Sequence, residues 1–212
     1  MHYVPRHQVP PSLQHIKRRY TQGWVDFYQH GRGKKPSDRR WVKYLPQLSR
    51  CFHNLCGYCE TTCRGEVDHY RPKSKAPHLV YTWDNWIFAC HDCNNMKGEK
   101  WPHFGYVDPC AVIPSEHPKT FFLFDLRSCE IVPAPTLKGT RKARAVQMIE
   151  DLDLNAFHHL KRRLEHLSSM LEVLAGHNPA DPDHIQYRRQ VCERTAPLSS
   201  LARTTLKSLG FD

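Results

Sequence analysis

Long apolar runs are absent from this sequence. It contains no stretch of about 18 or more apolar residues, the length that a helix needs to cross a membrane. Its first residues, from Met1 to Arg6, also lack the apolar segment of a secretory signal. We therefore expect a cytoplasmic protein with no membrane partner.

Acidic residues are scarce relative to basic ones. The chain has 31 Lys and Arg against 21 Asp and Glu, which gives a formal charge of +10. Such an excess favours polyanionic partners, because each phosphate that a protein neutralises releases a counterion. Nucleic acid is the expected partner, although a basic balance can also serve solubility alone.

The chain has no internal repeat and no low-complexity tract, and its 212 residues fit one domain with helical flanks. We predict four segments: an N-terminal helical extension over 1–50, a metal-binding core over 51–101, an irregular or β segment over 102–137 and a C-terminal helical region over 138–212.

Apolar periodicity and helix-end residues predict the helices of both flanks. The first helix should begin near Pro11 and end at Gly31, and a second should begin after Ser37 with a kink or boundary at Pro46. Asn155 is a plausible N-cap for a long helix near the C-terminus. Its apolar stripe would comprise Phe157, Leu160, Leu164, Leu167, Leu171 and Leu174.

Two CxxC pairs are the strongest motif of the chain. They are formed by Cys56 with Cys59 and by Cys90 with Cys93. Disulfides are a poor interpretation in a reducing compartment, whereas two such pairs can close a tetrahedral zinc site. The other five cysteines show no pairing pattern, so we expect free thiols or small core residues.

The residues between and after the two pairs predict the local structure of the core. Glu66 to Tyr70 alternates in polarity and precedes Arg71-Pro72, which indicates a short strand and a turn. The residues from Trp83 to Ala89 indicate a second strand, and the stretch from Cys90 to Lys100 has no proline and indicates a short helix. The predicted order is β, β, α.

These features together resemble the HNH (ββα-metal) endonuclease core. The resemblance implies an α+β fold, in which an HNH core with a four-cysteine structural zinc is flanked by N-terminal and C-terminal α-helices. The matching positions are Cys56, Cys59, Asp68, His69, Pro72, Asn85, Cys90, Cys93, Asn94 and Lys97.

The resemblance also implies a role for each of these side chains. His69 would be the general base that deprotonates water, and Asp68 and Asn94 would hold a catalytic Mg²⁺ or Mn²⁺ through oxygen atoms. Asn85 would orient the loop and the base through hydrogen bonds. Lys97 could contact phosphate, although it could equally be a solvated helix lysine. The implied reaction is hydrolysis of phosphodiester bonds, of DNA in preference to tRNA or other RNA.

Weaker motifs outside the core include Val107-Asp108-Pro109, the junction from Leu152 to Asn155, and Arg162-Arg163. With the short helical stretch before the core, this layout is similar to that of PtuB, the HNH protein of Septu and some retron anti-phage systems. This similarity implies an ATPase partner of the PtuA type and a retron reverse transcriptase with its RNA–DNA product. An exposed surface that binds the ATPase would come from the first helix, with Trp24 and Phe27, or from the segment around Leu201.

One alternative of another class stays open at this stage. A zinc-stabilised module could bind nucleic acid or act as an adaptor without catalysis. Replacing His69 by Ala separates the two hypotheses, because an adaptor would keep its activity.

Overall fold

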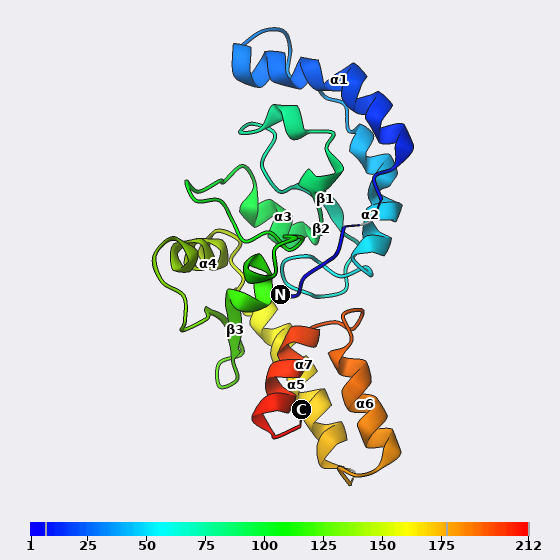
Figure 1. Cartoon of the computed structure of the whole chain (residues 1–212), viewed down its shortest axis with the longest axis vertical. Helices are drawn as coiled ribbons and strands as arrows, with labels where there is room; N and C mark the ends of the chain where they lie inside the picture. Colours follow the sequence, from blue (N-terminus) through cyan, green and yellow to red (C-terminus); the bar gives the residue numbers. More distant parts are fainter. Residues whose placement is uncertain (7, 177, 212) are drawn as a thin grey trace.

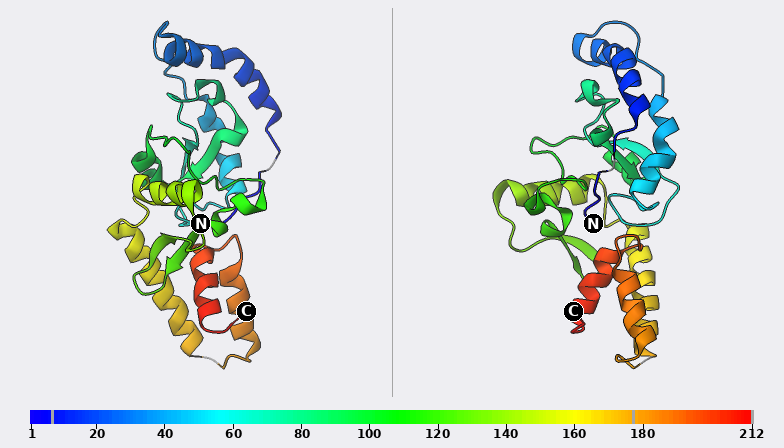
Figure 2. Two further views of the ribbon diagram at one scale, coloured as in Figure 1. Left: turned by 60° about the vertical axis from the view of Figure 1, so that its left-hand side comes forward. Right: turned by 45° about the vertical axis from the view of Figure 1, so that its right-hand side comes forward.

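The computed structural model describes residues 1–6, 8–176 and 178–211. The molecule is elongated, with helix α1 at one end, two strands and a short helix in the middle, and a group of three helices at the other end (Figures 1 and 2). The strands form two separate two-stranded sheets.

The N-terminal region begins with α1 (Pro11–His30), which packs against the 3₁₀ turn η2 (Pro77–Leu79). Its proline start and its end at Gly31, which has a φ of 61°, confirm the predicted helix. The second predicted helix is split into the 3₁₀ turn η1 (Arg40–Tyr44) and α2 (Leu45–Cys51). Pro46 lies in the first turn of α2, where its missing N–H has no helical partner, so it marks a boundary.

The middle of the molecule has the predicted β, β, α order. Strand β1 (Glu66–His69) pairs antiparallel with β2 (Trp86–Ala89), and α3 (His91–Lys97) follows directly. The second strand begins three residues later than predicted, because Trp83–Asn85 form the 3₁₀ turn η3. Every residue of β2 is buried, so this strand is the centre of the core.

The segment over 102–137, predicted to be irregular or β, contains a small hairpin. Strands β3 (Phe122–Asp125) and β4 (Glu130–Pro133) pair antiparallel, after the 3₁₀ turns η4 (Pro114–Glu116) and η5 (Pro118–Thr120). Helix α4 (Gly139–Asp151) packs against β4 and joins the hairpin to the C-terminal helices.

The C-terminal region consists of α5 (Phe157–Ala175), α6 (Pro182–Cys192) and α7 (Ser199–Ser208). The predicted cap of α5 is wrong, since Ala156 is the N-cap. The amide of Asn155 instead pairs with the backbone N–H and C=O of Ile131 in β4 and accepts a hydrogen bond from Arg163. The side chain of Asn155 thus makes a tertiary contact with β4 and does not cap the start of α5, as the local sequence had predicted.

The apolar stripe of α5 is also divided between two faces. Leu167 and Leu174 are buried together with Met170, whereas Phe157, Leu164 and Leu171 are exposed. The buried face meets α7, so only part of the stripe completes the core.

Two of the three residues expected in the partner surface are covered by the fold. Trp24 and Leu201 are both buried in the core, and Phe27 is half-buried. Trp24 and Leu201 therefore stabilise the fold and are covered by it. Among the described helices, none is long and apolar enough to cross a bilayer.

Candidate active site and metal centre

The four cysteines of the two CxxC pairs converge on one point. Their Sγ atoms all lie within 4.8 Å of one another, and those of Cys59 and Cys90 are 3.8 Å apart. A tetrahedral zinc with Zn–S bonds of about 2.3 Å places its sulfur atoms about 3.8 Å apart. The cluster therefore has the donor type and spacing of a structural four-cysteine metal site.

Backbone groups and a histidine surround this cluster. The N–H of Tyr58 points at Cys56 Sγ and the N–H of Cys93 points at Cys90 Sγ, both at 3.5 Å. His159 from α5 is buried, and its Nε2 lies 3.8 Å from Cys93 Sγ. The spacing of the motifs could not reveal His159, because it follows Cys93 by 66 residues. The metal centre thus lies against the C-terminal helices as well as the core.

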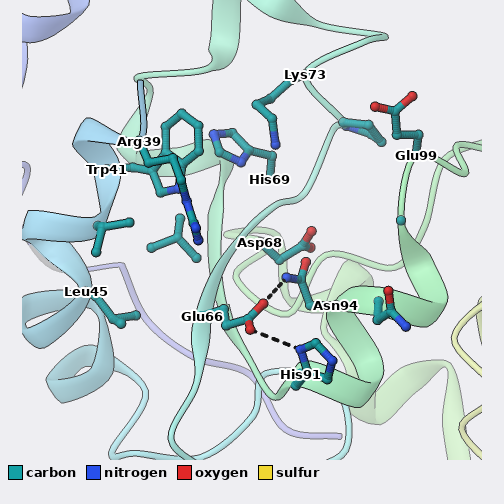
Figure 3. A pocket seen from close by; sticks show the side chains of 15 residues that line it. Arg39, Trp41, Leu45, Glu66, Asp68, His69, Lys73, His91, Asn94 and Glu99 are labelled. Atoms are coloured by element: carbon teal, nitrogen blue, oxygen red, sulfur yellow. Dashed lines mark hydrogen bonds and ion pairs between the residues drawn. The ribbon is translucent and has the colours of Figure 1, made fainter. Parts of the chain in front are cut away.

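A cavity of about 380 Å³ lies beside the sheet, and several predicted site residues line it. Arg39 and Trp41 of the N-terminal extension form one side, strand β1 contributes Asp68 and His69, and α3 contributes Asn94 (Figure 3). Three segments that are distant in sequence are thereby brought together around one small volume.

His69 is held by its surroundings in a defined state. Its ring packs edge-on against Trp41 at 4.8 Å and against Trp86 at 6.3 Å, and its Nε2 lies 2.9 Å from the carbonyl oxygen of Val80. A carbonyl can only accept, so Nε2 carries the proton and Nδ1 keeps a lone pair. Burial, together with the nearby charge of Lys73, holds the pKa of His69 well below its usual value. The imidazole is therefore neutral at pH 7.

Both carboxylate oxygens of Asp68 have buried partners. Oδ1 accepts from Lys97 Nζ at 2.9 Å, and Oδ2 accepts from the hydroxyl of Tyr58 at 2.5 Å. Burial, with the negative charge of Asp68, raises the pKa of Tyr58 and keeps its phenol protonated as a donor. Since a carboxylate offers about four lone-pair positions, Asp68 retains acceptor capacity toward the cavity that it lines.

Lys97 is placed differently from the expected phosphate contact. Its side chain is fully buried, and Nζ donates to Asp68 Oδ1 and to the carbonyl oxygen of His69 at 2.8 Å. It is also not the solvated helix lysine of the alternative interpretation. The ammonium neutralises Asp68 and fixes the end of β1 against α3.

Asn94 is joined to Glu66, a residue that the motif comparison did not single out. Asn94 Nδ2 donates to Glu66 Oε2 at 2.6 Å, and His91 Nδ1 lies 3.1 Å from Glu66 Oε1 (Figure 3). Partial burial opposes ionisation of Glu66, but these two hydrogen bonds outweigh it and lower its pKa. Glu66 could have been found from its position two residues before Asp68, because alternate residues of a strand lie on the same face.

Asn85 lies away from the cavity and organises the chain after β1. Its Oδ1 accepts from the N–H of Arg71 at 2.9 Å, and its Nδ2 donates to the carbonyl oxygen of Arg71 at 3.1 Å. The N–H of Tyr70 also bonds the backbone carbonyl of Asn85 at 2.8 Å. This is the geometry that a loop-orienting role requires.

The cavity also offers a fitting set of ligands for a hard divalent cation. Glu66, Asp68 and Asn94 supply carboxylate and amide oxygens, and Asn94 Oδ1 is left over after its Nδ2 bonds Glu66. Oxygen atoms of this kind are the ligands that Mg²⁺ and Mn²⁺ prefer. The donor set is therefore compatible with the expected catalytic metal.

Comparisons with known proteins agree with this geometry. Residues 56–100 match the family model described as HNH endonuclease. The chain is also 31% identical over 134 residues to the Septu protein PtuB of Bacillus thuringiensis, with 57% of this chain and 47% of that protein covered. The chain thus spans about half the length of this relative. The cysteine cluster, the ββα order and the family match together make residues 56–100 an HNH endonuclease domain.

Proposed function

We propose that this protein is a metal-dependent endonuclease that hydrolyses phosphodiester bonds of nucleic acid, with DNA as the preferred substrate. The observation that carries the proposal is the pairing of a neutral, buried His69 with the oxygen ligands Glu66, Asp68 and Asn94 around one cavity. A general base and a cation site side by side are what phosphodiester hydrolysis requires.

His69 acts as the base. Its Nδ1 accepts a proton from the attacking water, while Nε2–H remains on the carbonyl oxygen of Val80. That carbonyl stabilises the positive charge that develops on the ring, and the packing of Trp41 and Trp86 fixes the ring plane. The low pKa of His69 keeps the base unprotonated at neutral pH.

A divalent cation held by Asp68 and Asn94, with Glu66 beside them, would supply Lewis-acid stabilisation of the transition state and of the leaving oxygen. Lys97 donates a hydrogen bond to Asp68 and holds its carboxylate oriented toward the cavity. Tyr58 does the same from the opposite side. These two buried donors therefore position a ligand and do not touch the substrate.

Arg39 and Lys73 are the cations that line the cavity on the substrate side. Arg39 is exposed, and no hydrogen bond or ion pair joins its guanidinium to another residue in the described part of the chain. Lys73 lies with Nζ 5.2 Å from the centre of the Trp41 ring, and burial lowers its pKa. Arginine forms paired hydrogen bonds with phosphate, so Arg39 is suited to hold the scissile strand.

The test is an assay of the purified full chain on plasmid, single-stranded DNA and tRNA with Mg²⁺, Mn²⁺ or EDTA. Cleavage of DNA that depends on added metal and stops in EDTA is the expected result. Cleavage of tRNA alone would move the substrate to RNA. Nucleic-acid binding without cleavage under every metal condition would support the non-catalytic zinc module instead.

We further propose that this nuclease is the effector of a bacterial anti-phage system and works with an ATPase of the PtuA type. The support is the similarity to Septu protein PtuB over 57% of the chain. Zn²⁺ is the proposed structural ion, because four cysteines at this spacing match its preferred geometry. Co-expression of the chain with such an ATPase and isolation of a complex tests the partnership.

A further inference from the structure

A second cavity, of about 550 Å³, lies apart from the HNH domain. Its walls come from the first residues of the chain, from η5 and β3, and from the end of α6 with α7. These segments lie side by side in each view of the molecule (Figures 1 and 2). The volume falls in the range of small-molecule sites, which is roughly 300–1,000 Å³.

The lining of this cavity is strongly basic. Lys119, Arg194, Arg203 and Lys207 all contribute to it, and no acidic side chain of the described residues does. None of these four cations forms an ion pair within the described chain. Arg203 and Lys207 are four residues apart on α7, a spacing at which like charges repel each other. Four cations gathered without a counter-charge indicate a site for an anion.

The cations are partly preorganised by the fold. The guanidinium of Arg203 donates to the carbonyl oxygen of Cys192 and to Ser200 Oγ, which fixes its direction at the cavity wall. The buried carboxylate of Glu60 accepts from the N–H of Ser200, a residue of the cavity wall, and is paired with the amino group of Met1 and with His2 at 3.5 Å. Its negative charge is therefore already neutralised and does not cancel the basic lining.

The remaining wall is aromatic and apolar. Tyr3 and His117 stack with their ring centres 4.0 Å apart and their planes 4° from parallel. Phe122 and Phe124 of β3 complete this side. Phosphate binds cations, and a base or sugar packs on aromatic rings, so the two walls together match the two halves of a nucleotide.

We propose that this cavity is a nucleotide-binding site, in which the basic wall holds phosphate groups and the aromatic wall packs against the base. The phosphate could be carried by a free nucleotide or by the end of a nucleic-acid strand, which share this chemistry. The site lies outside the HNH domain and is distinct from the cavity of His69.

The experiment measures binding by calorimetry to the full chain carrying His69→Ala, so that no probe is cleaved. The probes are ATP, inorganic pyrophosphate, adenosine and a 5′-phosphorylated oligonucleotide. The test variant adds Arg194→Glu with Lys207→Glu, two exposed cations of the cavity. The matched control adds Arg127→Glu with Lys142→Glu, which are exposed, lie outside the cavity and change the net charge equally.

ATP and pyrophosphate should compete with each other, and adenosine alone should bind far more weakly. The test variant should lose about tenfold or more in affinity, which is about 1.4 kcal/mol, while the control stays within about twofold. Competition by the oligonucleotide in place of ATP would assign the phosphate to a strand end. No binding of any phosphate probe, or an equal loss in both variants, would overturn the proposal. Because the readout is binding and not cleavage, its failure would leave the nuclease proposal intact.

Discussion

At the scale of single residues, one buried ion pair explains how the cavity keeps its charge distribution. The fully buried ammonium of Lys97 lies against the carboxylate of Asp68, so neither charge faces an apolar wall alone. The cost of burying one charge is offset only while the other remains. The ligand set of the cavity therefore depends on a side chain that never reaches the substrate.

Replacing Lys97 by Ala should consequently destabilise the fold. Breaking a buried pair by removing one partner typically costs about 3–5 kcal/mol, which lowers the Tm of a chain of this size by roughly 6–20 °C. Lys75→Ala, at an exposed lysine of the loop after β1, should leave the Tm within about 2 °C. The measurement is the Tm of both variants by thermal unfolding. An unchanged Tm for Lys97→Ala with weaker DNA binding would restore the phosphate-contact role.

His69→Ala should abolish cleavage and leave nucleic-acid binding and metal content intact, because the imidazole contacts Trp41, Trp86 and the carbonyl oxygen of Val80 and not the cysteine cluster. Loss of a general base typically costs about two to four orders of magnitude in rate. His91→Ala is the comparison, since His91 lies in the same cavity but is exposed. Near-full cleavage by His69→Ala and its loss in His91→Ala would assign the base to His91.

The pH dependence of cleavage by the wild type provides a second measurement at His69. The base works in its neutral form, and its pKa is well below the usual value of about 6.5. The rate should therefore stay high as the pH falls through 6.5 and decline only at lower pH. The same shift makes the unfolded state bind the extra proton first, so the stability contributed by neutral His69 is present above pH 6.5 and declines as the pH falls below it.

Arg39 and Arg40 form a natural pair for testing phosphate recognition. Arg39 lines the cavity and forms no hydrogen bond or ion pair with the described residues, whereas Arg40 packs on the Tyr20 ring at 3.8 Å and pairs with Asp38 at 3.5 Å. Arg39→Ala should lower kcat/KM by roughly tenfold or more, because a charge-assisted phosphate contact contributes about 1.5–3 kcal/mol. Arg40→Ala removes the same charge and should change kcat/KM less than about threefold. Equal losses would indicate a general effect of net charge and not a specific contact.

At the scale of elements, sequence predicted the parts whose signal is local. The polarity pattern of β1, the two CxxC pairs and the proline and glycine ends of α1 each lie within a few residues, and the structure confirms these elements. Asn155 is the counter-example, because its amide bonds Ile131 and not the start of α5. A cap and a tertiary contact compete for the same side chain, and only the fold decides between them.

The candidate site shows the same division between local and distant signals. The motif predicted that Asp68, His69 and Asn94 lie together, and they line one cavity because strand β1 and helix α3 pack against each other. Arg39 and His159 were missed, since each reaches the site from a segment far away in sequence. The burial of Lys97 was missed for a further reason, because side-chain direction depends on packing that spacing does not encode.

The fold of the elements around the metal centre should depend on bound metal. Two ligands come from the segment before β1 and two from the start of α3, so metal binding and folding are linked. Cys93→Ser, or removal of the metal with a chelator, should unfold the domain and loosen α5, which packs His159 against Cys93. Cys63→Ser, a half-buried cysteine outside the cluster, should be neutral. Metal analysis should give one zinc per chain, and a folded, active preparation without zinc would contradict this prediction.

At the scale of the whole molecule, α5 is the helix that exposes a row of large apolar side chains. Trp24 of the N-terminal helix and Leu201 of α7 are buried, so these two side chains do not form the expected docking surface. Deleting the first 30 residues would therefore remove core side chains such as Leu13 and Trp24 and would not test partner binding. By contrast, Phe157, Leu164 and Leu171 recur every seven residues along the exposed face of α5. That spacing keeps three apolar side chains on one line of a helix.

We expect the proposed ATPase partner to cover this line, because apolar side chains that are exposed to water are stabilised when another chain buries them. Leu164→Glu with Leu171→Glu should abolish co-elution with the ATPase on size exclusion and keep the zinc content and the Tm. The control is Val112→Glu with Ile113→Glu, since these two side chains are more exposed than the pair on α5 but lie in a loop. A complex that survives the α5 substitutions but is lost in the control would place the interface on the 112–113 loop. A chain that elutes alone and cleaves DNA equally well with and without the ATPase would contradict the partnership itself.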